Sequence, residues 1–285
     1  MIYDKRFSPN PPDSMTASAD CDTAAALAAT ALKAGRAIME IYEAGFSVET
    51  KPDRSPVTEA DRRSEALILA DLERLAPAVP AISEEAGAPA AAAPAPPRFF
   101  LVDPLDGTRE FIGRNGEFTV NIALIEDGRP VIGVVLAPAV RRLFVGCGRG
   151  QAFELPMGDE MAVLNRASWR PIAARAPRPG RLRAVASRSH REAETDAFLA
   201  KIAAQSIVSA GSSLKFCLLA CGEADVYPRF GSTMEWDTAA GQAVLEAAGG
   251  LVLTVQGEPL GYGKSASGYA NPPFIAWARP EIVIS

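Results

Sequence analysis

Residues 103–111, with the sequence Asp-Pro-Leu-Asp-Gly-Thr-Arg-Glu-Phe, limit what this chain can fold into more than any other segment. They follow a run of apolar residues that is typical of the end of a buried strand. Pro104 fixes its own backbone angle, and Gly107 permits a turn that other residues resist. A strand that ends in such a turn can direct the carboxylates of Asp103 and Asp106 toward one point.

Two carboxylates that converge in a low dielectric repel each other unless a cation lies between them. A hard divalent cation such as Mg²⁺ prefers oxygen ligands and would remove this repulsion. From this segment alone, metal ligation by Asp103 and Asp106 and an ordinary Asp-Gly turn with solvated carboxylates are equally good explanations. Phosphatases of the haloacid dehalogenase type carry Asp-x-Asp-Gly-Thr, but the two acids here are one residue further apart, so we set that alternative aside.

The composition argues against a binder of nucleic-acid polymers and leaves the binding of small anions open. The chain has 285 residues, 48% of them hydrophobic, and a net charge of −5. Basic and acidic residues are interspersed, without the basic patch that binding to a nucleic-acid polymer requires. An acidic protein can still bind small anions where metal ions supply the positive field.

We expect three parts along the chain. Residues 1–22 form a polar, disordered extension at the start, in which Met15 is an alternative to Met1 as the first residue. Residues 23–177 form an N-terminal α+β domain that binds metal, and residues 178–285 form a C-terminal α/β domain. The boundary lies in a Pro-rich stretch. An Ala-rich segment near the start is interrupted by charged residues, so we expect neither a signal peptide nor a membrane span.

The cysteines are scattered and predict no disulfide framework, which fits a reducing cytoplasm. We interpret them as small buried apolar residues. A metal pair made by Cys217 and Cys221 is less favoured, because no further Cys or His cluster completes a zinc site. The four positions are Cys21, Cys147, Cys217 and Cys221.

Hydrophobic periodicity predicts helices and strands throughout the chain. Thr58 and Asp61 are placed as a capping box at the start of one helix, and Asp127-Gly128 predicts a β-hairpin. Residues 86–98 form an Ala/Pro-rich connection. Predicted helices cover residues 23–43, 58–75, 192–204, 211–221 and 237–249. Predicted strands cover residues 48–51, 79–85, 118–125, 131–136, 142–145, 151–154, 183–187, 207–209, 224–227, 251–255 and 274–278.

Several acids lie at the ends of predicted elements, where side chains can converge. Taken alone, Asp61 is better explained as a residue that caps its helix, and Asp237 can also be explained as a helix cap. Thr108 adds a hydroxyl that, with an acid partner, could deprotonate an attacking water. Because a metal lowers the pKa of that water, the only histidine, His190, is not required as a base. The acids are Asp61, Glu84, Asp103, Asp106 and Asp237.

A second group suits a phosphate. Ser212, Ser213 and Lys215 lie in the first turn of a predicted helix, where exposed N–H groups and hydroxyls bind anions. The alternative is a Ser-rich helix cap with a solvated lysine. Arg229 could be another anion contact.

These segments together resemble the signatures of the inositol monophosphatase superfamily. The resemblance extends from about residue 24 to residue 274 and is closest to its 3'(2'),5'-bisphosphate nucleotidase branch. The superfamily signatures are Val57–Asp61, Ser83–Glu85, Asp103–Thr108 and Trp236–Gly241, and those of the branch are Arg109–Ile112, Arg114–Asn121, Gly211–Cys217 and Tyr227–Gly231.

The resemblance implies a mixed α+β fold of the α/β class, an αβαβα sandwich with an antiparallel N-terminal sheet and a mixed C-terminal sheet. It implies two or three Mg²⁺ ions, with Asp61 and Thr108 activating the attacking water and Glu84 beside them. The implied metal ligands are Glu84, Asp103, Asp106, Asp237 and the backbone carbonyl of Leu105. The implied substrate contacts are Asp106, Gly107, Thr108, Ser187, His190, Gly211, Ser212, Lys215, Arg229 and Asp237.

The implied reaction is hydrolysis of the 3'-phosphate of adenosine 3',5'-bisphosphate (PAP) to AMP and phosphate by metal-activated water. Activity on the sulfated analogue PAPS, inhibition by lithium and a role in sulfur metabolism are implied as well. The rival substrates are inositol monophosphate and fructose 1,6-bisphosphate, and a less favoured alternative is a non-catalytic nucleotide sensor. We expect a cytoplasmic monomer or homodimer, with peripheral association at the inner membrane as an alternative.

The chain departs from the branch in two places. Arg109 replaces the lysine that is common there, which preserves the charge but alters the hydrogen-bond geometry. The connection at residues 86–98 has an unusual composition, so its conformation is not inherited.

Overall fold

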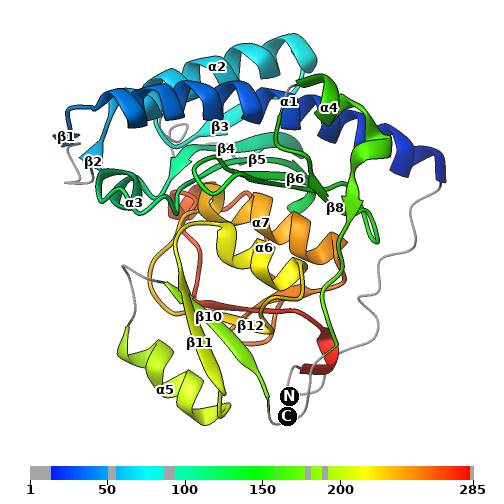
Figure 1. Ribbon diagram of the computed structural model, residues 1–285. Coiled ribbons are helices and arrows are strands. Elements are labelled where there is room, and N and C mark those ends of the chain that lie inside the picture. The colour runs from blue at the N-terminus through cyan, green and yellow to red at the C-terminus, as the bar shows by residue number, and fades with distance from the viewer. Residues whose placement is uncertain are drawn as a thin grey trace.

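The chain folds into five alternating layers of helices and sheets, seen in the computed structural model of Figure 1. Helices α1 and α2 cover the outer face of a seven-stranded sheet. Helices α6 and α7 lie between this sheet and a five-stranded one, whose other face is covered by α5. The predicted αβαβα sandwich is therefore confirmed. The structure describes residues 14–50, 56–86, 94–158, 160–176, 181–187 and 192–282.

The five predicted helices are present, with one correction at the start, whereas the short helices Thr108–Ile112 and Glu160–Leu164 were not predicted. Helix α1 begins at Ser14 rather than near Thr23, so the part of the predicted disordered extension from residue 14 to 22 is helical. Cys21 and Ala24 are fully buried, which shows that packing stabilises this part of the helix. Residues 1–13 lie outside the described part. The helices are α1 (Ser14–Ala44), α2 (Glu59–Leu75), α3 (Thr108–Ile112), α4 (Glu160–Leu164), α5 (Ala193–Lys201), α6 (Leu214–Ala220) and α7 (Glu235–Ala247).

The seven-stranded sheet has the order β3-β4-β5-β6-β7-β8-β9. Its strands pair antiparallel except at one edge, where β3 runs parallel to β4, so the predicted purely antiparallel sheet is wrong at that edge. A parallel pair requires a long connection, and the segment between β3 and β4 has the necessary length. Residues 87–93 of this predicted Ala/Pro-rich connection lie outside the described part. The strands are β3 (Ala81–Ser83), β4 (Arg98–Asp106), β5 (Thr119–Glu126), β6 (Arg129–Ala137), β7 (Arg142–Gly146), β8 (Ala152–Leu155) and β9 (Arg170–Pro171).

The predicted hairpin is confirmed between β5 and β6. Asp127 and Gly128 have φ angles of 46° and 75°, both in the left-handed region that a two-residue hairpin turn requires. A separate two-stranded ribbon pairs β1 (Glu49–Thr50) with β2 (Pro56–Val57).

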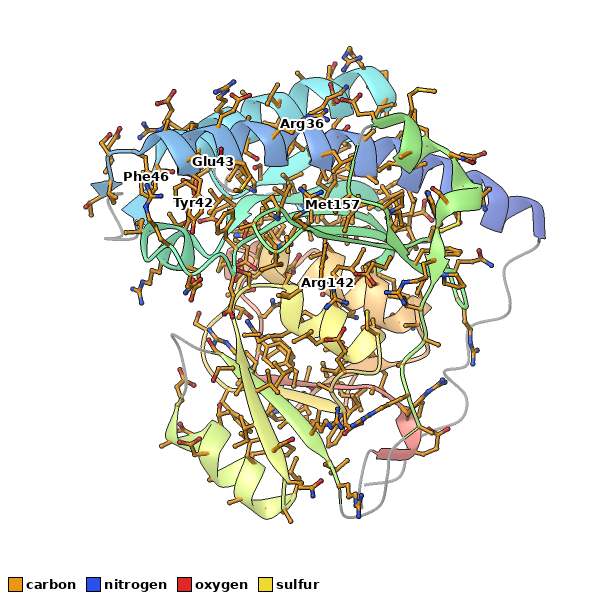
Figure 2. The ribbon with its side chains drawn as sticks, viewed as in Figure 1. Arg36, Tyr42, Glu43, Phe46, Arg142 and Met157 are labelled. Carbon is orange, nitrogen blue, oxygen red and sulfur yellow. A yellow bond between two sulfur atoms is a disulfide. The ribbon has the colours of Figure 1, made fainter. Side chains whose placement is uncertain are left out.

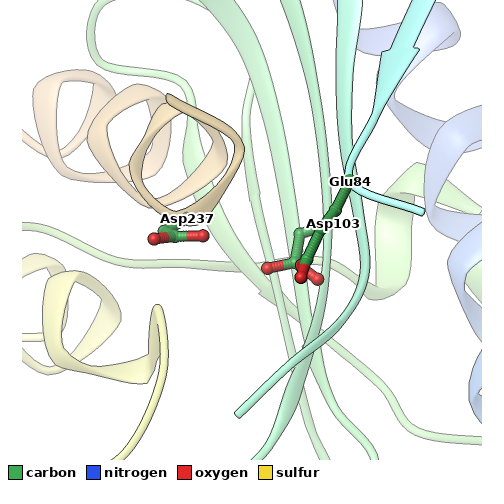
Figure 3. A group of neighbouring side chains, drawn as sticks. All are labelled: Glu84, Asp103 and Asp237. Carbon is green, nitrogen blue, oxygen red and sulfur yellow. The ribbon is translucent and has the colours of Figure 1, made fainter. Parts of the chain in front are cut away.

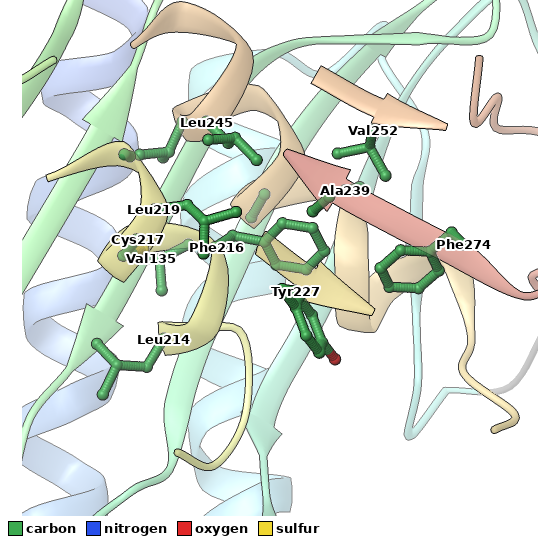
Figure 4. Close-up of a cluster of buried hydrophobic side chains, with 14 of the residues drawn as sticks. Val135, Leu214, Phe216, Cys217, Leu219, Tyr227, Ala239, Leu245, Val252 and Phe274 are labelled. Carbon is green, nitrogen blue, oxygen red and sulfur yellow. The ribbon is translucent and has the colours of Figure 1, made fainter. Parts of the chain in front are cut away.

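The five-stranded sheet has the order β11-β10-β12-β14-β13 and is mixed, as predicted. Strands β11, β10 and β12 are parallel, while β12, β14 and β13 are antiparallel. Figure 4 shows its core against α6, where the rings of Phe216, Tyr227 and Phe274 pack with centroids 5.3 to 5.8 Å apart. The strands are β10 (Arg183–Ser187), β11 (Ser206–Ala210), β12 (Val226–Arg229), β13 (Leu251–Thr254) and β14 (Phe274–Trp277).

The two halves of the chain are joined through the middle layer. A Cβ added to Gly133 would lie 2.2 Å from the carbonyl oxygen of Ala240, so α7 packs backbone to backbone on β6. Arg142 on β7 lies beside this layer and forms ion pairs with Glu154 and Glu223, both at 2.8 Å (Figure 2). The division of the chain at residue 178 stays a prediction.

The expectation that the chain has no disulfide is wrong. Cys21 on α1 and Cys147 after β7 form a disulfide, although 126 positions separate them. The pairing depends on α1 crossing the sheet, which no local pattern reveals. Cys217 is a free, buried residue, as interpreted, and Cys221 is free and half-buried. No helix within the described ranges is long and apolar enough to cross a membrane.

Candidate metal and phosphate site

The site begins at the N-terminus of α2, where the predicted capping box is confirmed. Oδ2 of Asp61 accepts from the backbone N–H of Thr58 at 2.8 Å and from its hydroxyl at 2.7 Å. Oδ1 of the same carboxylate accepts from the hydroxyl of Thr108 at 3.2 Å. Asp61 is therefore both a helix cap and the partner of Thr108, two roles that the sequence left as alternatives.

The end of β4 places the acids that follow it. Its pairing with β5 shifts register between Asp103 and Asp106, and Gly107 then adopts a φ of 91°. Oδ1 of Asp103 accepts from the backbone N–H of Leu105 at 3.0 Å. The irregular strand end therefore turns both acids toward the middle layer, as the Pro and Gly positions predicted.

Three acids from separate elements converge in Figure 3. Glu84 follows β3, Asp103 lies on β4 and Asp237 lies in the first turn of α7. One carboxylate oxygen from each residue lies within 4.8 Å of the others. A donor set made only of carboxylate oxygens at this spacing fits a hard divalent cation such as Mg²⁺.

The ionisation of these acids agrees with a cation site. Burial raises the pKa of Asp103 well above its usual value, and the charges of Glu84, Asp106 and Asp237 raise it further. Burial and the charge of Asp106 do the same to Asp237. The pKa of Asp106 is raised to about 6 by burial, against the opposing charge of Lys215. Without a cation, the fold disfavours the ionised forms of these three aspartates. A bound cation would reduce the repulsion between their carboxylates.

Asp106 and Leu105 lie beside the three-acid group. Oδ2 of Asp106 accepts from the backbone N–H of Ser213 at 2.8 Å and from the side-chain amide of Asn121 at 3.3 Å. The carbonyl of Leu105 lies 3.5 Å from the hydroxyl of Thr108. The sequence suggested Ser213 as a phosphate contact, whereas its backbone N–H holds Asp106 in the structure. Asn121 was assigned no role from sequence, although it lies opposite Asp103 in the register of the predicted hairpin strand.

A cavity of about 580 Å³ opens next to the acids. Four of the predicted site residues do not line the cavity: Asp61, Asp103, Leu105 and Gly211. His190 lies outside the described residues. Glu110, Tyr227 and the segment 232–234 also contribute to its wall. The predicted residues that line it are Glu84, Asp106, Gly107, Thr108, Ser187, Ser212, Lys215, Arg229 and Asp237.

Lys215 and Arg229 supply positive charge to this cavity. Lys215 is only 5% exposed, and its ammonium group donates to the carbonyl of Ser212 at 2.6 Å and lies 5.3 Å from the ring centre of Tyr227. Burial, together with the charge of Arg229, lowers the pKa of Lys215 to about 8, against the opposing charge of Asp106. Two cations near the metal ligands suit a doubly charged anion.

Hydrogen bonds connect Gly211 and Ser212 to the segment that contains Asp106 and Glu117. The hydroxyl of Ser212 shares its proton between the carbonyls of Asp106, at 2.7 Å, and Glu117, at 2.8 Å. The N–H of Gly211 donates to Oε2 of Glu117 at 2.9 Å. Glu117, which the sequence analysis did not single out, therefore fixes the loop that carries the predicted anion contacts.

Comparison with known proteins identifies the chain's relatives. The profile of the inositol monophosphatase family matches residues 19–281. The 3'(2'),5'-bisphosphate nucleotidase CysQ of Escherichia coli (strain K12) is 45% identical over 255 residues, which cover 86% of this chain and 95% of the relative. CysQ of Buchnera aphidicola is 41% identical over 251 residues, which cover 87% of this chain and 91% of the relative.

The fold has a close counterpart among solved structures. CysQ from Bacteroides thetaiotaomicron, described as a bacterial member of the inositol monophosphatase family, superposes with a TM-score of 0.78. It is 40% identical, and the match covers 90% of this chain and 97% of that one.

Proposed function

The chain belongs to the inositol monophosphatase family, in its CysQ-type 3'(2'),5'-bisphosphate nucleotidase branch, and from that premise we propose that it removes the 3'-phosphate of PAP. The products would be AMP and phosphate. The observation that carries the proposal is the convergence of Glu84, Asp103 and Asp237 beside a cavity that holds two buried cationic side chains.

We propose two or three Mg²⁺ ions at this site. Glu84, Asp103 and Asp237 would hold one. Asp106, which lines the cavity, and the carbonyl of Leu105 would complete the set of ligands. When bound, the ions would neutralise the phosphate and lower the pKa of the attacking water. The backbone at Gly107 and Thr108 borders the same cavity and would orient the phosphoryl oxygens.

Asp61 and Thr108 would handle the proton of the attacking water. Two donors from Thr58 hold Oδ2 of Asp61, so Oδ1 stays directed at the hydroxyl of Thr108. Thr108 can donate to Asp61 while its oxygen accepts from the water, which passes a proton toward the carboxylate. Glu84 lines the cavity and would assist.

The remaining anionic group of PAP would lie at the cationic end of the cavity. Lys215 and Arg229 would contact it there, and Ser187 borders the same space. Ser212 and Gly211 would act by shaping the loop. A contact from His190 stays a prediction.

The decisive experiment measures phosphate release from PAP with Mg²⁺ and after chelation. Release should require Mg²⁺, and Asp61→Asn should lower kcat by about 10² to 10⁴ because the proton acceptor is lost while its shape is kept. Asp71→Asn is the matched control, since Asp71 is an acid on the same helix that pairs with Thr30 and Lys33 away from the site. Full activity in Asp61→Asn, or no release by the wild type, would refute the proposal.

A substrate panel separates the remaining alternatives. Higher kcat/KM for inositol monophosphate or fructose 1,6-bisphosphate than for PAP would reject the nucleotidase, and tight PAP binding without turnover would indicate a sensor. PAPS and added Li⁺ belong in the same panel, with hydrolysis and inhibition expected. A cytoplasmic location, the alternative of peripheral membrane association and the choice between monomer and homodimer stay predictions.

A further inference from the structure

The segment at residues 260–271 holds the first turn of α7, the turn that carries Asp237. The carboxylate of Glu235, which is fully buried, accepts from the backbone N–H groups of Gly263 at 2.7 Å and Lys264 at 2.8 Å. The Lys264 ammonium adds an ion pair at 2.7 Å. The backbone N–H of Glu235 in turn donates to the carbonyl of Tyr269 at 2.9 Å.

Two side chains of this segment meet at the hydroxyl of Thr238. Tyr262 shares its hydroxyl proton between Oε1 of Gln242, at 2.7 Å, and Oγ1 of Thr238, at 3.2 Å. The amide of Asn271 donates to the same Oγ1 at 3.0 Å and to the carbonyl of Met234 at 2.8 Å. The hydroxyl of Thr238 itself donates a hydrogen bond to the carbonyl of Glu235 at 3.2 Å, so its hydrogen-bonding capacity is filled.

These contacts bracket Asp237 from both sides. Its Oδ2 accepts from the backbone N–H of Met234 at 2.8 Å, and Met234 is the residue whose carbonyl Asn271 holds. Thr238 follows Asp237 directly. A change in the pitch of this turn would therefore move the Asp237 carboxylate relative to Glu84 and Asp103, whose oxygens lie within 4.8 Å of it.

We propose that Tyr262 and Asn271 are positioning residues for the metal site, which they serve by fixing the first turn of α7. Neither side chain lines the cavity, so they act through Thr238 and Met234 rather than on the substrate. The inference rests on the proposed function only in requiring a divalent cation at the three acids. Partners behind a metal ligand keep its geometry, and their loss weakens metal affinity about 10- to 100-fold.

The test titrates Mg²⁺ into protein without substrate, by calorimetry, for the wild type, Tyr262→Phe and Asn271→Ala. Both variants should bind Mg²⁺ with a Kd raised about tenfold or more, because the ligand loses its fixed geometry. Tyr269→Phe is the matched control, since Tyr269 is a buried tyrosine of the same segment whose ring packs on Trp236. Its Kd should equal that of the wild type.

Thermal unfolding without metal separates positioning from general stability. A lowered melting temperature with unchanged Mg²⁺ affinity in both variants would overturn the proposal and leave a purely structural role. Wild-type protein that binds Mg²⁺ but releases no phosphate from PAP would refute the nucleotidase alone, and the positioning result would stand. Wild-type protein that binds no Mg²⁺ would overturn both.

Discussion

At the scale of single residues, the site is defined by closely spaced acids, buried or half-buried, that repel one another. Asp103 is 1% exposed, and the negative charges of Glu84, Asp106 and Asp237 disfavour the ionisation of its carboxyl group. Such a group is retained in a fold at a cost to stability, since burying unpaired like charges is unfavourable. Lys215 offsets part of this cost at Asp106. A bound cation would offset the remaining electrostatic cost. Because a cation binds the ionised carboxylates, metal binding is coupled to the protonation of the site.

This coupling predicts a pH-dependent stabilisation by Mg²⁺. The raised pKa values mean that the metal-free folded protein holds more protons than the unfolded chain above about pH 4, so its stability should fall as pH rises through about 6 and beyond. Mg²⁺ binds the ionised carboxylates, so the increase in melting temperature that it causes should be larger at about pH 8 than at about pH 5. Thermal scans with Mg²⁺ and with chelator measure the difference, and an equal increase at both pH values would contradict the prediction.

At the scale of elements, α1 is held at both ends. Near its start the disulfide joins it to the turn after β7, and at its C-terminal end Tyr42 and Phe46 pack on Phe111 of α3 with ring centroids 5.1 and 4.4 Å apart (Figure 2). Since α3 begins at Thr108, the long helix also supports the segment that carries the hydroxyl proposed to activate the attacking water.

The disulfide should contribute to stability rather than to catalysis. Because it closes a long loop, Cys21→Ser should lower the free energy of unfolding by about 2 to 4 kcal/mol. Denaturant unfolding measures the loss, and kcat at saturating Mg²⁺ should not change, since the bond lies outside the cavity. Cys221→Ser, which alters a free and half-buried cysteine, serves as the control. Equal stability of Cys21→Ser and wild type would show that the bond does not stabilise the folded protein.

At the scale of the whole molecule, α7 connects both sheets to the site. Its backbone lies against Gly133 and Gly146 of the seven-stranded sheet, and its first turn carries Asp237. The acids of the proposed metal site come from both sides of this contact, so the distance between the layers sets the distance between the acids.

Enlarging one of these glycines should therefore affect both stability and metal binding. The methyl group of Gly133→Ala would lie 2.2 Å from the carbonyl oxygen of Ala240, so we expect a loss of about 1 to 3 kcal/mol from overpacking and weaker Mg²⁺ binding. Urea unfolding and calorimetry give the two quantities. Gly158→Ala is the control, because a methyl group there meets no atom within 4 Å. A Gly133→Ala protein with wild-type stability would show that the layers can separate without cost.

Features that depend on neighbours in the chain could be predicted from sequence. The capping box of Thr58 and Asp61 and the hairpin turn at Asp127 formed as expected, because each is decided by hydrogen bonds and backbone angles within a few residues. The turn after Asp103 could also be predicted, since proline restricts and glycine widens the choice of backbone angles locally.

Contacts between distant segments were decided by the tertiary structure. The meeting of Glu84, Asp103 and Asp237, the disulfide of Cys21 and the support of Thr238 by the segment 260–271 all join parts far apart along the chain. Periodicity and spacing predict which face of an element is buried, but not which element lies opposite. That choice follows from how the layers close around their shared core. The family resemblance implied a common site for the scattered acids, but local patterns did not, and their convergence is seen only in the folded chain.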